Sequence, residues 1–431
     1  MVRLILVLTL LAGVALAFLI FRPGSEYPPY RLLGVNNPVQ RPEIFRRFHE
    51  YLPARAIAPS SQPRLWTRIP ETLEVTYTWQ DQQKSLADFL DQTHTMAFMV
   101  LRDGAIVEER YALGANPNSI MTIWSASKSY TATMIAIALH QGKIQSLDDP
   151  VEKYAHQFKG TDYGQVSIRN LLMMASGMDF SHNEGFILSD RTWMYLGIQF
   201  LGLDLDEMTA RMTARTQAGQ EFHYLAPDTH VLSAVVRGAW DNQKTYAQLV
   251  QEELWEPFGF GGEAFWVQNQ PGEEGHALGH CCLSVRLIEF AQLGQVYLEG
   301  GSFRGQRHLP EGWTELAGRP AARFQQPSAT GRYPHLGYGL QFWVPLQSDG
   351  EFLAMGTFGQ NLWIDQQNHV VIAHLSASPM DGGASAEERH RVYRKIAKAA
   401  ALGRPFGRAD AGESDPKAMP ASDDRGASSL D

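Results

Sequence analysis

Ser125 and Lys128 are the two residues whose types and spacing most directly suggest chemistry. Residues three apart on a helix are neighbours, and the apolar run over residues 131–139 predicts a buried helix that begins beside the serine. A serine hydroxyl is a weak nucleophile until a base takes its proton, and burial lowers the pKa of a lysine toward the range where it can act as that base. N–H groups at the start of the helix favour negative charge on the serine oxygen. The pair therefore predicts serine-dependent acyl transfer.

The Ser-x-x-Lys spacing by itself is a weak signal. The same pattern occurs at Ser414 and Lys417, in a polar tail that contains Asp and Pro and would not hold a helix. For the first pair, the alternative interpretation is a serine that caps a helix and a lysine that faces solvent. Segments further along the chain decide between the two interpretations.

Three other segments predict elements that could complete a site. Residues 96–111 predict a hairpin with the Asp-Gly pair at 103–104 as its turn. Tyr224 follows a glycine turn and precedes an apolar helix pattern. Residues 354–375 predict two strands joined by a polar turn at 365–368. A serine, a lysine and a phenol on separate elements are a plausible set of groups for acyl transfer.

In this order, the segments resemble the motifs of the class C β-lactamase and penicillin-binding-protein-like serine hydrolase superfamily, which carries Ser-x-x-Lys, Tyr-x-Asn and a Lys/His-Thr-Gly strand. The sequence is most similar to the branch of 6-aminohexanoate-dimer hydrolases and carboxylesterases, whose second motif looks like Tyr-x-Ser-Pro and whose third ends in Gly-Gln. Here the second motif reads Tyr-Leu-Ala-Pro (224–227) and the third Thr-Phe-Gly-Gln (357–360). The resemblance covers roughly residues 70–400. It implies an α/β (α+β) fold of the β-lactamase/transpeptidase type, an antiparallel sheet flanked by helices with a mostly helical inserted region.

The resemblance also implies roles for individual residues. Ser125 would be the nucleophile, and Lys128 and Tyr224 would act together as the general base that later returns the proton to the leaving group. The oxyanion hole would consist of the backbone N–H groups of Ser125 and Gln360. An acyl-Ser125 ester would form, and water would then release the acid. The alternative for Tyr224 is a core tyrosine whose hydroxyl binds a backbone group.

Departures from the family motifs bear on the substrate. Ala226 replaces the Asn or Ser of the second motif, and Thr357 and Phe358 replace the Lys/His-Thr pair that would bind a carboxylate. We expect Phe358 and Gly359 to form a neutral, partly aromatic rim, which favours an ester or a lipophilic amide over an anionic antibiotic. Asp190 falls where the aminohexanoate hydrolases place an acidic residue near the substrate pocket. Its alternative, which we favour, is a helix-capping aspartate.

Three functions are consistent with these residues. The first is a serine hydrolase that cleaves a carboxylic ester or amide through an acyl-enzyme on Ser125. The second is a β-lactamase or a D-alanyl-D-alanine carboxypeptidase-type enzyme, against which the missing Lys at Thr357 counts. The third is a non-catalytic peptide-binding module with the same fold, conceivable because of Ala226 and Phe358. The complete set of Ser125, Lys128 and Tyr224 argues against the third.

Composition and charge restrict the partners. The net charge is −9 and the acidic residues are dispersed, which excludes nucleic acid as a partner because phosphate binding needs a clustered basic face. The expected partner is a small-molecule ester or amide.

The cysteines and histidines predict no cofactor. Two adjacent cysteines, Cys281 and Cys282, are predicted to be buried free thiols. His276 and His280 have metal-like spacing, but no Glu follows the first as a zinc protease would need, so we predict no metal and no organic cofactor. His280 and His223 could lie near the pocket by family position, although surface or satisfied histidines are the favoured interpretation.

The N-terminus carries the localisation signal. Arg3 precedes an uncharged apolar stretch over residues 4–21, which is long enough to span a bilayer. We expect residues 1–22 to be a signal anchor that holds the protein at the periplasmic face of a bacterial inner membrane. The alternative is a signal peptide cleaved after the Ala-Leu-Ala at 15–17, which would leave a periplasmic or secreted protein.

The rest of the chain divides into three predicted parts. Residues 23–69 are Pro-rich and predict an extended stalk that then lies against the domain. Residues 70–404 predict the hydrolase domain, which ends with a helix from a capping box at Ser385 to about Ala401. Residues 405–431 are rich in Ala, Gly, Ser and Asp and predict a disordered tail.

Overall fold

The computed structural model describes residues 9, 13, 17, 18, 20–22, 24–69, 73, 75–181, 189–331, 333–379 and 383–402. The predicted tail at 405–431 and most of the predicted anchor at 1–22 lie outside these residues. Within the described part of the chain, no helix is both long enough and apolar enough to cross a membrane.

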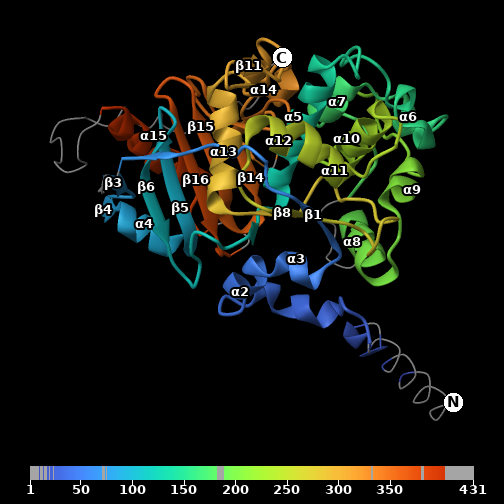
Figure 1. Cartoon of the computed structure of the whole chain (residues 1–431), viewed down its shortest axis with the longest axis horizontal. Coiled ribbons are helices and arrows are strands. Elements are labelled where there is room, and N and C mark those ends of the chain that lie inside the picture. Colours follow the sequence, from blue (N-terminus) through green and yellow to red (C-terminus); the bar gives the residue numbers. More distant parts are fainter. Residues whose placement is uncertain are drawn as a thin grey trace, which may run out of the picture.

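An eight-stranded sheet is the centre of the molecule (Figure 1). Its strand order is β12-β13-β14-β15-β16-β5-β6-β2, and neighbouring strands are antiparallel except for the parallel pair β2 and β6. The strands are β2 (Thr67–Arg68), β5 (Thr95–Arg102), β6 (Ala105–Tyr111), β12 (Leu336–Tyr338), β13 (Trp343–Pro345), β14 (Glu351–Gly356), β15 (Gln360–Asp365) and β16 (Val370–Ser376). This sheet confirms the predicted fold class.

Helices cover both faces of the sheet, so its central strands are buried throughout. Alternate residues of β5 separate into two cores: Met99 and Leu101 pack with α13 (Leu287–Leu298), while Phe98 and Val100 pack with α15 (Ala386–Ala401) and α4 (Leu86–Gln92). Strands covered on both sides need apolar residues at successive positions, which is why β5 and β16 read as continuous apolar runs.

Two local predictions are confirmed. β5 and β6 form the expected hairpin, and its turn residues Asp103 and Gly104 have φ angles of 49° and 78°, the left-handed values that a two-residue turn requires. α15 ends at Ala401, and the side chain of its N-cap residue Ser385 accepts a hydrogen bond from the backbone N–H of Glu388.

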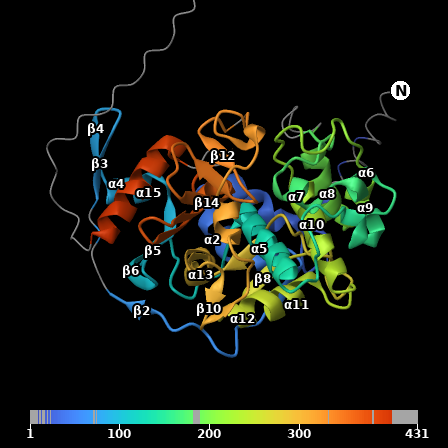
Figure 2. The same cartoon turned by 90° about the horizontal axis from the view of Figure 1, so that it is seen from above.

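The helical region predicted between the first two motifs lies at the end of the molecule opposite α15 (Figure 2). Its helices surround α10 (Ala226–Ala239), which packs against α5 (Ser127–His140). They are α6 (Asp162–Gln165), α7 (Ile168–Leu172), α8 (Asp190–Leu201) and α9 (Leu205–Ala210). After α10 the chain forms α11 (Tyr246–Val250) and α12 (Glu256–Phe258), and α14 (Trp313–Ala317) follows α13. One-turn helices connect them: η3 (Val151–Lys153), η4 (His156–Phe158), η5 (Gln251–Trp255) and η6 (Arg323–Gln325).

The Pro-rich segment differs from the predicted extended stalk. It folds into η1 (Pro29–Asn36), α2 (Arg41–Arg46), α3 (Phe48–Tyr51) and β1 (Ala54–Ile57). The proline of α2 lies in the first turn, where its missing N–H group is not needed, and the helices bury Phe45 and Phe48. The Arg41 guanidinium donates to the carbonyl oxygens of Ala377 and Ser378, at 2.9 and 2.7 Å. Apolar burial thus makes this segment part of the domain.

A smaller four-stranded sheet joins this segment to the site described below. Its order is β1-β8-β9-β7, with all pairs antiparallel. The strands that follow β1 are β7 (Met121–Thr122), β8 (Ala264–Val267) and β9 (Leu283–Val285). Two hairpins lie at the periphery: β3 (Thr76–Trp79) with β4 (Gln82–Ser85), and β10 (Ser302–Phe303) with β11 (Gln306–Arg307).

Candidate active site

Ser125 and Lys128 lie together where a short turn leads into a buried helix. Ser125 is the middle residue of η2 (Trp124–Ala126), which runs directly into α5. The Nζ atom of Lys128 lies 3.2 Å from the Ser125 Oγ and donates to the carbonyl oxygen of His280 at 2.7 Å. Lys128 is only 2% exposed, and burial lowers the pKa of its amine to about 7. A substantial fraction of this amine is therefore neutral near pH 7 and can accept a proton.

The backbone around Ser125 is held by the smaller sheet. Ile123 N–H donates to the carbonyl of Leu283 at 3.0 Å, and Cys282 N–H donates to the carbonyl of Trp124 at 3.3 Å. Trp124 has a φ of 50°, a conformation that non-glycine residues rarely adopt. This fixed, strained turn presents the serine at the edge of the helix.

Tyr224 lies beside Ser125 and Lys128 and forms one wall of the site. Lys128 Nζ lies 5.2 Å from the centre of the Tyr224 ring, and a hydrogen bond links the phenol to Ser125. Burial raises the pKa of Tyr224 well above its ordinary value, an effect that the hydrogen bond to Ser125 only partly offsets. Trp343 and Tyr338 pack against the ring at centroid distances of 5.2 and 6.0 Å. The structure thus brings the three predicted catalytic groups together.

Another wall of the site is the turn between β14 and β15, called η7 (Thr357–Gly359). Gly356 precedes it, and a Cβ atom there would lie 2.2 Å from the carbonyl oxygen of Ile123. Glycine at this position therefore allows β14 to approach the turn that carries the nucleophile. Phe358 lies in the left-handed region at φ 65° and packs on Trp124 at a centroid distance of 5.3 Å.

Gln360 is not among the residues that line the pocket at Ser125, whereas Thr357 is. Gln360 is 1% exposed, lies opposite Gly356 in the β14–β15 register, and its side-chain amide donates to the carbonyl of Ser376 at 2.7 Å. Thr357 is exposed and is the first residue of η7. Thr357, Phe358 and Gly359 of the third motif line the pocket, and Gln360 directly follows them as the first residue of β15.

The pocket has a volume of about 330 Å³, and Ser125 is one of the residues that line it. Its apolar walls are Tyr224, Tyr333, Leu336, Trp343, Met355 and Phe358, with Gly359 beside them. Phe358 and Gly359 thus lie where the sequence analysis placed the substrate. Arg191 and Arg389 also line the pocket. Neither arginine was predicted from the sequence, because they lie on α8 and α15, outside the motifs.

Asp190 is not among the residues that line the pocket. It is exposed, and its carboxylate accepts hydrogen bonds from the backbone N–H and the hydroxyl of Ser181, at 2.8 and 2.9 Å. Ser189 is the N-cap residue of α8, so Asp190 is the first residue of the helix. Ser189, and not Asp190, therefore caps the helix, and Asp190 instead holds Ser181.

His280 lies at the site, although the favoured prediction was a surface or satisfied histidine. Its carbonyl oxygen binds Lys128, and its Nε2 lies 3.3 Å from the hydroxyl of Tyr195. Burial, together with the charge of Lys128 and of His230, lowers the pKa of His280 well below its ordinary value. Its Nδ1 is buried and has no hydrogen-bond partner among the described residues. His223 does not line the pocket.

The prediction of free thiols was wrong. Cys281 and Cys282 form a disulfide between adjacent residues. Cys282 lies in the left-handed region at a φ of 73°. The pair directly follows the carbonyl that binds Lys128.

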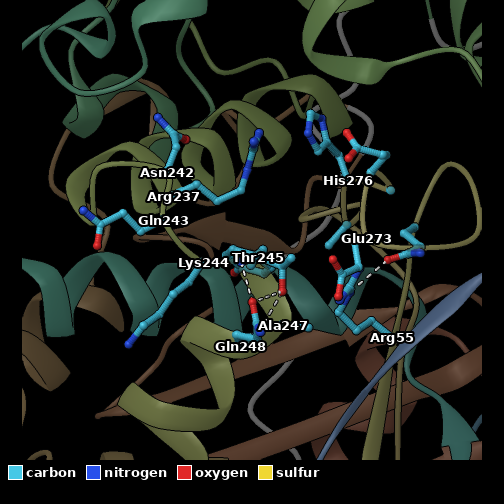
Figure 3. A pocket seen from close by; sticks show the side chains of 15 residues that line it. Arg55, Arg237, Asn242, Gln243, Lys244, Thr245, Ala247, Gln248, Glu273 and His276 are labelled. Atoms are coloured by element: carbon cyan, nitrogen blue, oxygen red, sulfur yellow. Dashed lines mark hydrogen bonds between the residues drawn. The ribbon is translucent and has the colours of Figure 1, made fainter.

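One cluster of possible metal ligands occurs among the described residues, formed by Asp204, Asp206 and His276. The carboxylate of Asp206 already binds the ring of His230 at 2.8 Å and the guanidinium of Arg237. Figure 3 shows Arg237 and His276 around the polar pocket that borders this cluster. Because Arg237 supplies a positive charge there, the cluster fits a charge network better than a cation site. The absence of a metal or organic cofactor stays a prediction.

Comparisons with known proteins agree with this geometry. Residues 83–397 match the family model described as Beta-lactamase. The 6-aminohexanoate-dimer hydrolase of Paenarthrobacter ureafaciens is 28% identical over 357 residues, which cover 78% of this chain and 85% of that protein.

Solved structures share the fold. A candidate 6-aminohexanoate-dimer hydrolase from Bacillus anthracis has a TM-score of 0.73 at 22% identity, covering 86% of this chain and 95% of that one. EstCE1, a hydrolase with promiscuous acyltransferase activity, has a TM-score of 0.54 at 18% identity, with coverages of 72% and 95%. A penicillin-binding protein homologue from Caulobacter crescentus has a TM-score of 0.54 at 14% identity, with coverages of 71% and 92%. Because the family model matches most of its length, the chain belongs to the beta-lactamase family and is a hydrolase of that family.

Proposed function

We propose that this protein is a serine hydrolase that cleaves a carboxylic ester or amide through an acyl-enzyme on Ser125. The observation that carries the proposal is the contact of the Ser125 hydroxyl with the buried amine of Lys128, whose pKa is about 7. A buried lysine that is neutral near physiological pH is costly for the fold and suited to proton transfer.

The Lys128 amine is the base of the proposed reaction, and Tyr224 relays the proton. Because burial raises the pKa of Tyr224, the phenol stays protonated at neutral pH and cannot itself be the initial base. It can donate a proton to one neighbour while it accepts one from another. The carbonyl of His280 binds one amine hydrogen of Lys128, which directs the nitrogen toward Ser125.

Acylation and deacylation follow from these positions. The Ser125 Oγ attacks the substrate carbonyl carbon while its proton passes to Lys128, and the oxyanion accepts hydrogen bonds from the backbone N–H groups of Ser125 and Gln360. We propose Gln360 as the second donor, because it directly follows the pocket-lining Gly359 and begins β15, which contacts η2. The bond to the leaving oxygen or nitrogen then breaks, and that atom takes the proton through Tyr224. In the second half, water attacks the acyl-Ser125 ester, Lys128 again takes the proton, and the carboxylic acid leaves with Ser125 regenerated.

Two observations support an ester or amide substrate. The similar protein from Paenarthrobacter ureafaciens is a hydrolase of a 6-aminohexanoate dimer, whose linkage is an amide. The third motif has Phe358 where the superfamily would have a polar residue, and this ring contributes to the apolar wall of the pocket.

A β-lactamase or D-alanyl-D-alanine carboxypeptidase-type activity is the second candidate. The specific observation in its favour is the pair of arginines in the pocket, because the substrates of those enzymes carry a carboxylate. A fluorescent penicillin would separate this activity from the first, since a penicillin-binding enzyme should be stably labelled at Ser125 and a β-lactamase should hydrolyse the penicillin. A non-catalytic peptide-binding module would give neither labelling nor turnover.

The decisive experiment is hydrolysis of p-nitrophenyl butyrate by the full chain, beside Ser125→Ala at equal concentration. We expect the wild type to turn over and the variant to lose activity, while circular dichroism shows both folded. Mass spectrometry of the wild type quenched during turnover should show one butyryl group on the peptide that contains Ser125. Equal rates in the two proteins would refute the mechanism.

We also propose that residues 1–22 hold the enzyme at the periplasmic face of a bacterial inner membrane. The support is the uncharged apolar sequence that follows Arg3. Membrane fractionation, followed by protease treatment of spheroplasts, tests this: the protein should sediment with membranes and be digested from outside. Recovery of a shortened, soluble protein would instead indicate signal-peptide cleavage.

A further inference from the structure

An apolar cavity lies beside the turn that carries Ser125. Its volume is about 640 Å³, nearly twice that of the active-site pocket, and lies in the range of about 300–1,000 Å³ that is typical of small-molecule sites. Trp124 contributes to its wall, and the same ring packs on Phe358 of the active-site pocket. Adjacent residues of one turn therefore line the two cavities.

Two segments far apart in the sequence form much of the apolar cavity. η1 and α3 contribute Leu32, Val35 and Phe48, and α8 contributes Leu196 and Ile198. Figure 1 shows the N-terminal segment, in blue, alongside α8. Walls of aliphatic and aromatic side chains suit an apolar ligand.

The most buried polar groups of this lining are already bonded within the protein. The side-chain amide of Gln268 donates to the carbonyl of Gln270 at 2.7 Å, and that of Asn269 donates to the carbonyl of Leu203 at 3.3 Å. Arg22 is the one charged residue among the described residues that line the cavity. A ligand inside would meet mainly apolar contacts, which favours a hydrocarbon chain over a polar molecule.

The rim of the apolar cavity is also apolar where it faces solvent. Leu33 of η1 is 69% exposed, Leu201 of α8 is 66% exposed, and both line the cavity from its two walls. Exposed apolar side chains that gather around one cavity mark a surface that another molecule or a membrane covers.

α8 is apolar on both of its faces. Met194 and Ile198 are buried, whereas Trp193 and Leu196 are exposed. The sequence over residues 192–203 contains no charged residue. A helix that is apolar all round is normally buried, so the outer face of α8 is expected to be covered by an apolar medium.

The sequence before the cavity indicates what that medium is. The uncharged stretch over residues 4–21, long enough to span a bilayer, ends directly before Arg22, which lines the cavity. Anchoring of that stretch in a bilayer places the rim at the membrane surface, because η1 begins at Pro29 and only a short linker intervenes. A membrane lipid is then the nearest source of a hydrocarbon chain.

We propose that the apolar cavity binds one acyl chain of a membrane phospholipid and that η1 and α8 contact the bilayer around it. This inference goes beyond the proposed hydrolase activity, and the choice of a membrane lipid rests on the proposed anchor. The chain enters between Leu33 and Leu201 and packs on the ring of Trp124. The bound chain thereby supports the turn that carries Ser125.

Photocrosslinking tests the proposal with the full chain. The protein is reconstituted into vesicles of phosphatidylethanolamine and phosphatidylglycerol that contain a phosphatidylcholine whose acyl chain ends in a diazirine. After illumination and proteolysis, mass spectrometry should find the lipid on peptides that contain residues 32–35 and 195–201. No label on these peptides would overturn the proposal, whether or not residues 1–21 are labelled. Label on these peptides without label on residues 1–21 would support the cavity and refute the anchor.

Charges at the rim should exclude the chain. Leu33→Glu combined with Leu201→Glu should lower the label on the cavity lining by at least about fivefold, because a carboxylate is costly to place against hydrocarbon. Leu65→Glu is the matched control: Leu65 is 90% exposed and does not line the cavity. The control should leave the label unchanged. A similar fall in the control would show that added charge alone displaces the lipid, and would overturn the proposal.

Filling the interior separates a chain inside the cavity from lipid that only covers the outer face. Val35→Trp adds bulk to one wall and leaves both rim leucines in place, so the label on the lining should again fall by at least about fivefold. Leu196→Trp, at an exposed position of the opposite wall, is a second filling variant in case the first does not fold. Undiminished label in a folded filling variant would overturn the cavity site.

The same labelling of Ser125→Ala separates this inference from the hydrolase proposal, because lipid binding needs no turnover. Equal label on the lining in this variant and in the wild type is expected. If no ester is hydrolysed but the lining is labelled, the lipid site stands and the hydrolase proposal fails. Loss of the label in folded Ser125→Ala would show that acyl transfer from the lipid produced it, and would overturn the lipid site.

Discussion

Two pockets in the described part of the chain treat charge in opposite ways. The pocket at Ser125 contains a buried amine, Lys128, whose hydrogen-bond partners are a hydroxyl and a carbonyl oxygen. The second pocket, of about 430 Å³, is lined by Arg237, Lys244 and His276 (Figure 3). There the charges are matched: Arg237 binds Asp206, Lys244 binds Glu252, and His276 lies 3.1 Å from Asp204. A network that pairs its charges supports the fold, whereas an unpaired buried amine indicates chemistry.

The pKa shifts follow the same division. In the second pocket, groups shift toward their charged forms. Burial alone would raise the pKa of Asp206, but the hydrogen bonds and charges of His230 and Arg237 outweigh burial and hold it well below its ordinary value. The hydrogen bond to Asp204 raises the pKa of His276. In the active-site pocket, burial favours the neutral forms of Lys128 and Tyr224. A neutral amine can accept a proton and a neutral phenol can donate one, so both groups suit proton transfer.

Replacing Lys128 with Met gives the largest expected effect and tests whether its amine serves function at the expense of stability. We expect kcat/KM for p-nitrophenyl butyrate to fall on the order of 10⁴- to 10⁶-fold, because the base is lost. The free energy of unfolding at pH 7 should rise by about 1–3 kcal/mol, because the folded protein no longer buries an amine that would be protonated when unfolded.

The sign of this stability effect can be checked with pH. The pKa of Lys128 is about 7 in the folded protein and 10.5 ordinarily, so the unfolded chain binds the proton more strongly between these values. The advantage of Lys128→Met should therefore shrink as the pH rises from 7 to 10.5. Urea denaturation at several pH values measures it, and a variant less stable than the wild type at pH 7 would contradict the comparison.

Replacing Tyr224 with Phe should lower kcat/KM by about 10²- to 10⁴-fold if the phenol relays the proton, and should leave the fold intact. Tyr338→Phe is the matched control, because this buried ring packs on Tyr224 but does not line the pocket. We expect a loss below about tenfold for the control. Equal losses in the two variants, measured with the same ester, would assign Tyr224 a packing role.

Replacing Arg237 with Met should break the second pocket without affecting catalysis directly. It leaves the buried carboxylate of Asp206 with His230 but without its arginine, so we expect a loss of about 3–5 kcal/mol in the free energy of unfolding. Lys244→Met removes an exposed pair and should have a much smaller effect on the free energy of unfolding. The kcat/KM per folded molecule, determined by active-site titration, should change by less than about threefold in both variants. A larger change in kcat/KM would show that the two pockets are coupled.

The sequence predicted the parts of the site that depend on local signals. The turn at Asp103 and Gly104 and the helix that begins after Ser385 have strong short-range patterns, and the structure confirms both. The contact of Lys128 with Ser125 follows from helical spacing. These features need no knowledge of how distant segments pack.

The parts that were missed depend on tertiary structure. Arg191 and Arg389 reach one pocket from helices almost 200 residues apart in the sequence, and neither belongs to a motif. The left-handed conformation of Phe358, at the turn that joins β14 to β15 beside the pocket, has no short-range sequence signal either. The carbonyl of His280 carries no side-chain signal at all. Backbone atoms and long-range contacts of this kind are not encoded in residue spacing.

The pH dependence of kcat/KM gives the smallest and most specific test. With Lys128 as the base, only the unprotonated enzyme reacts, so the rate should fall tenfold for each pH unit below about 7 and level off above it. The raised pKa of Tyr224 predicts no second loss until well into the alkaline range. His276 complicates the assignment, because Asp204 raises its pKa from 6.5 toward the same range. If Lys128 alone sets the pH profile, His276→Gln should leave that profile unchanged. A displaced midpoint in that variant would show that the second pocket acts on Lys128, and the ring of His230, 6.3 Å from that of His280, would be the shortest route for that coupling.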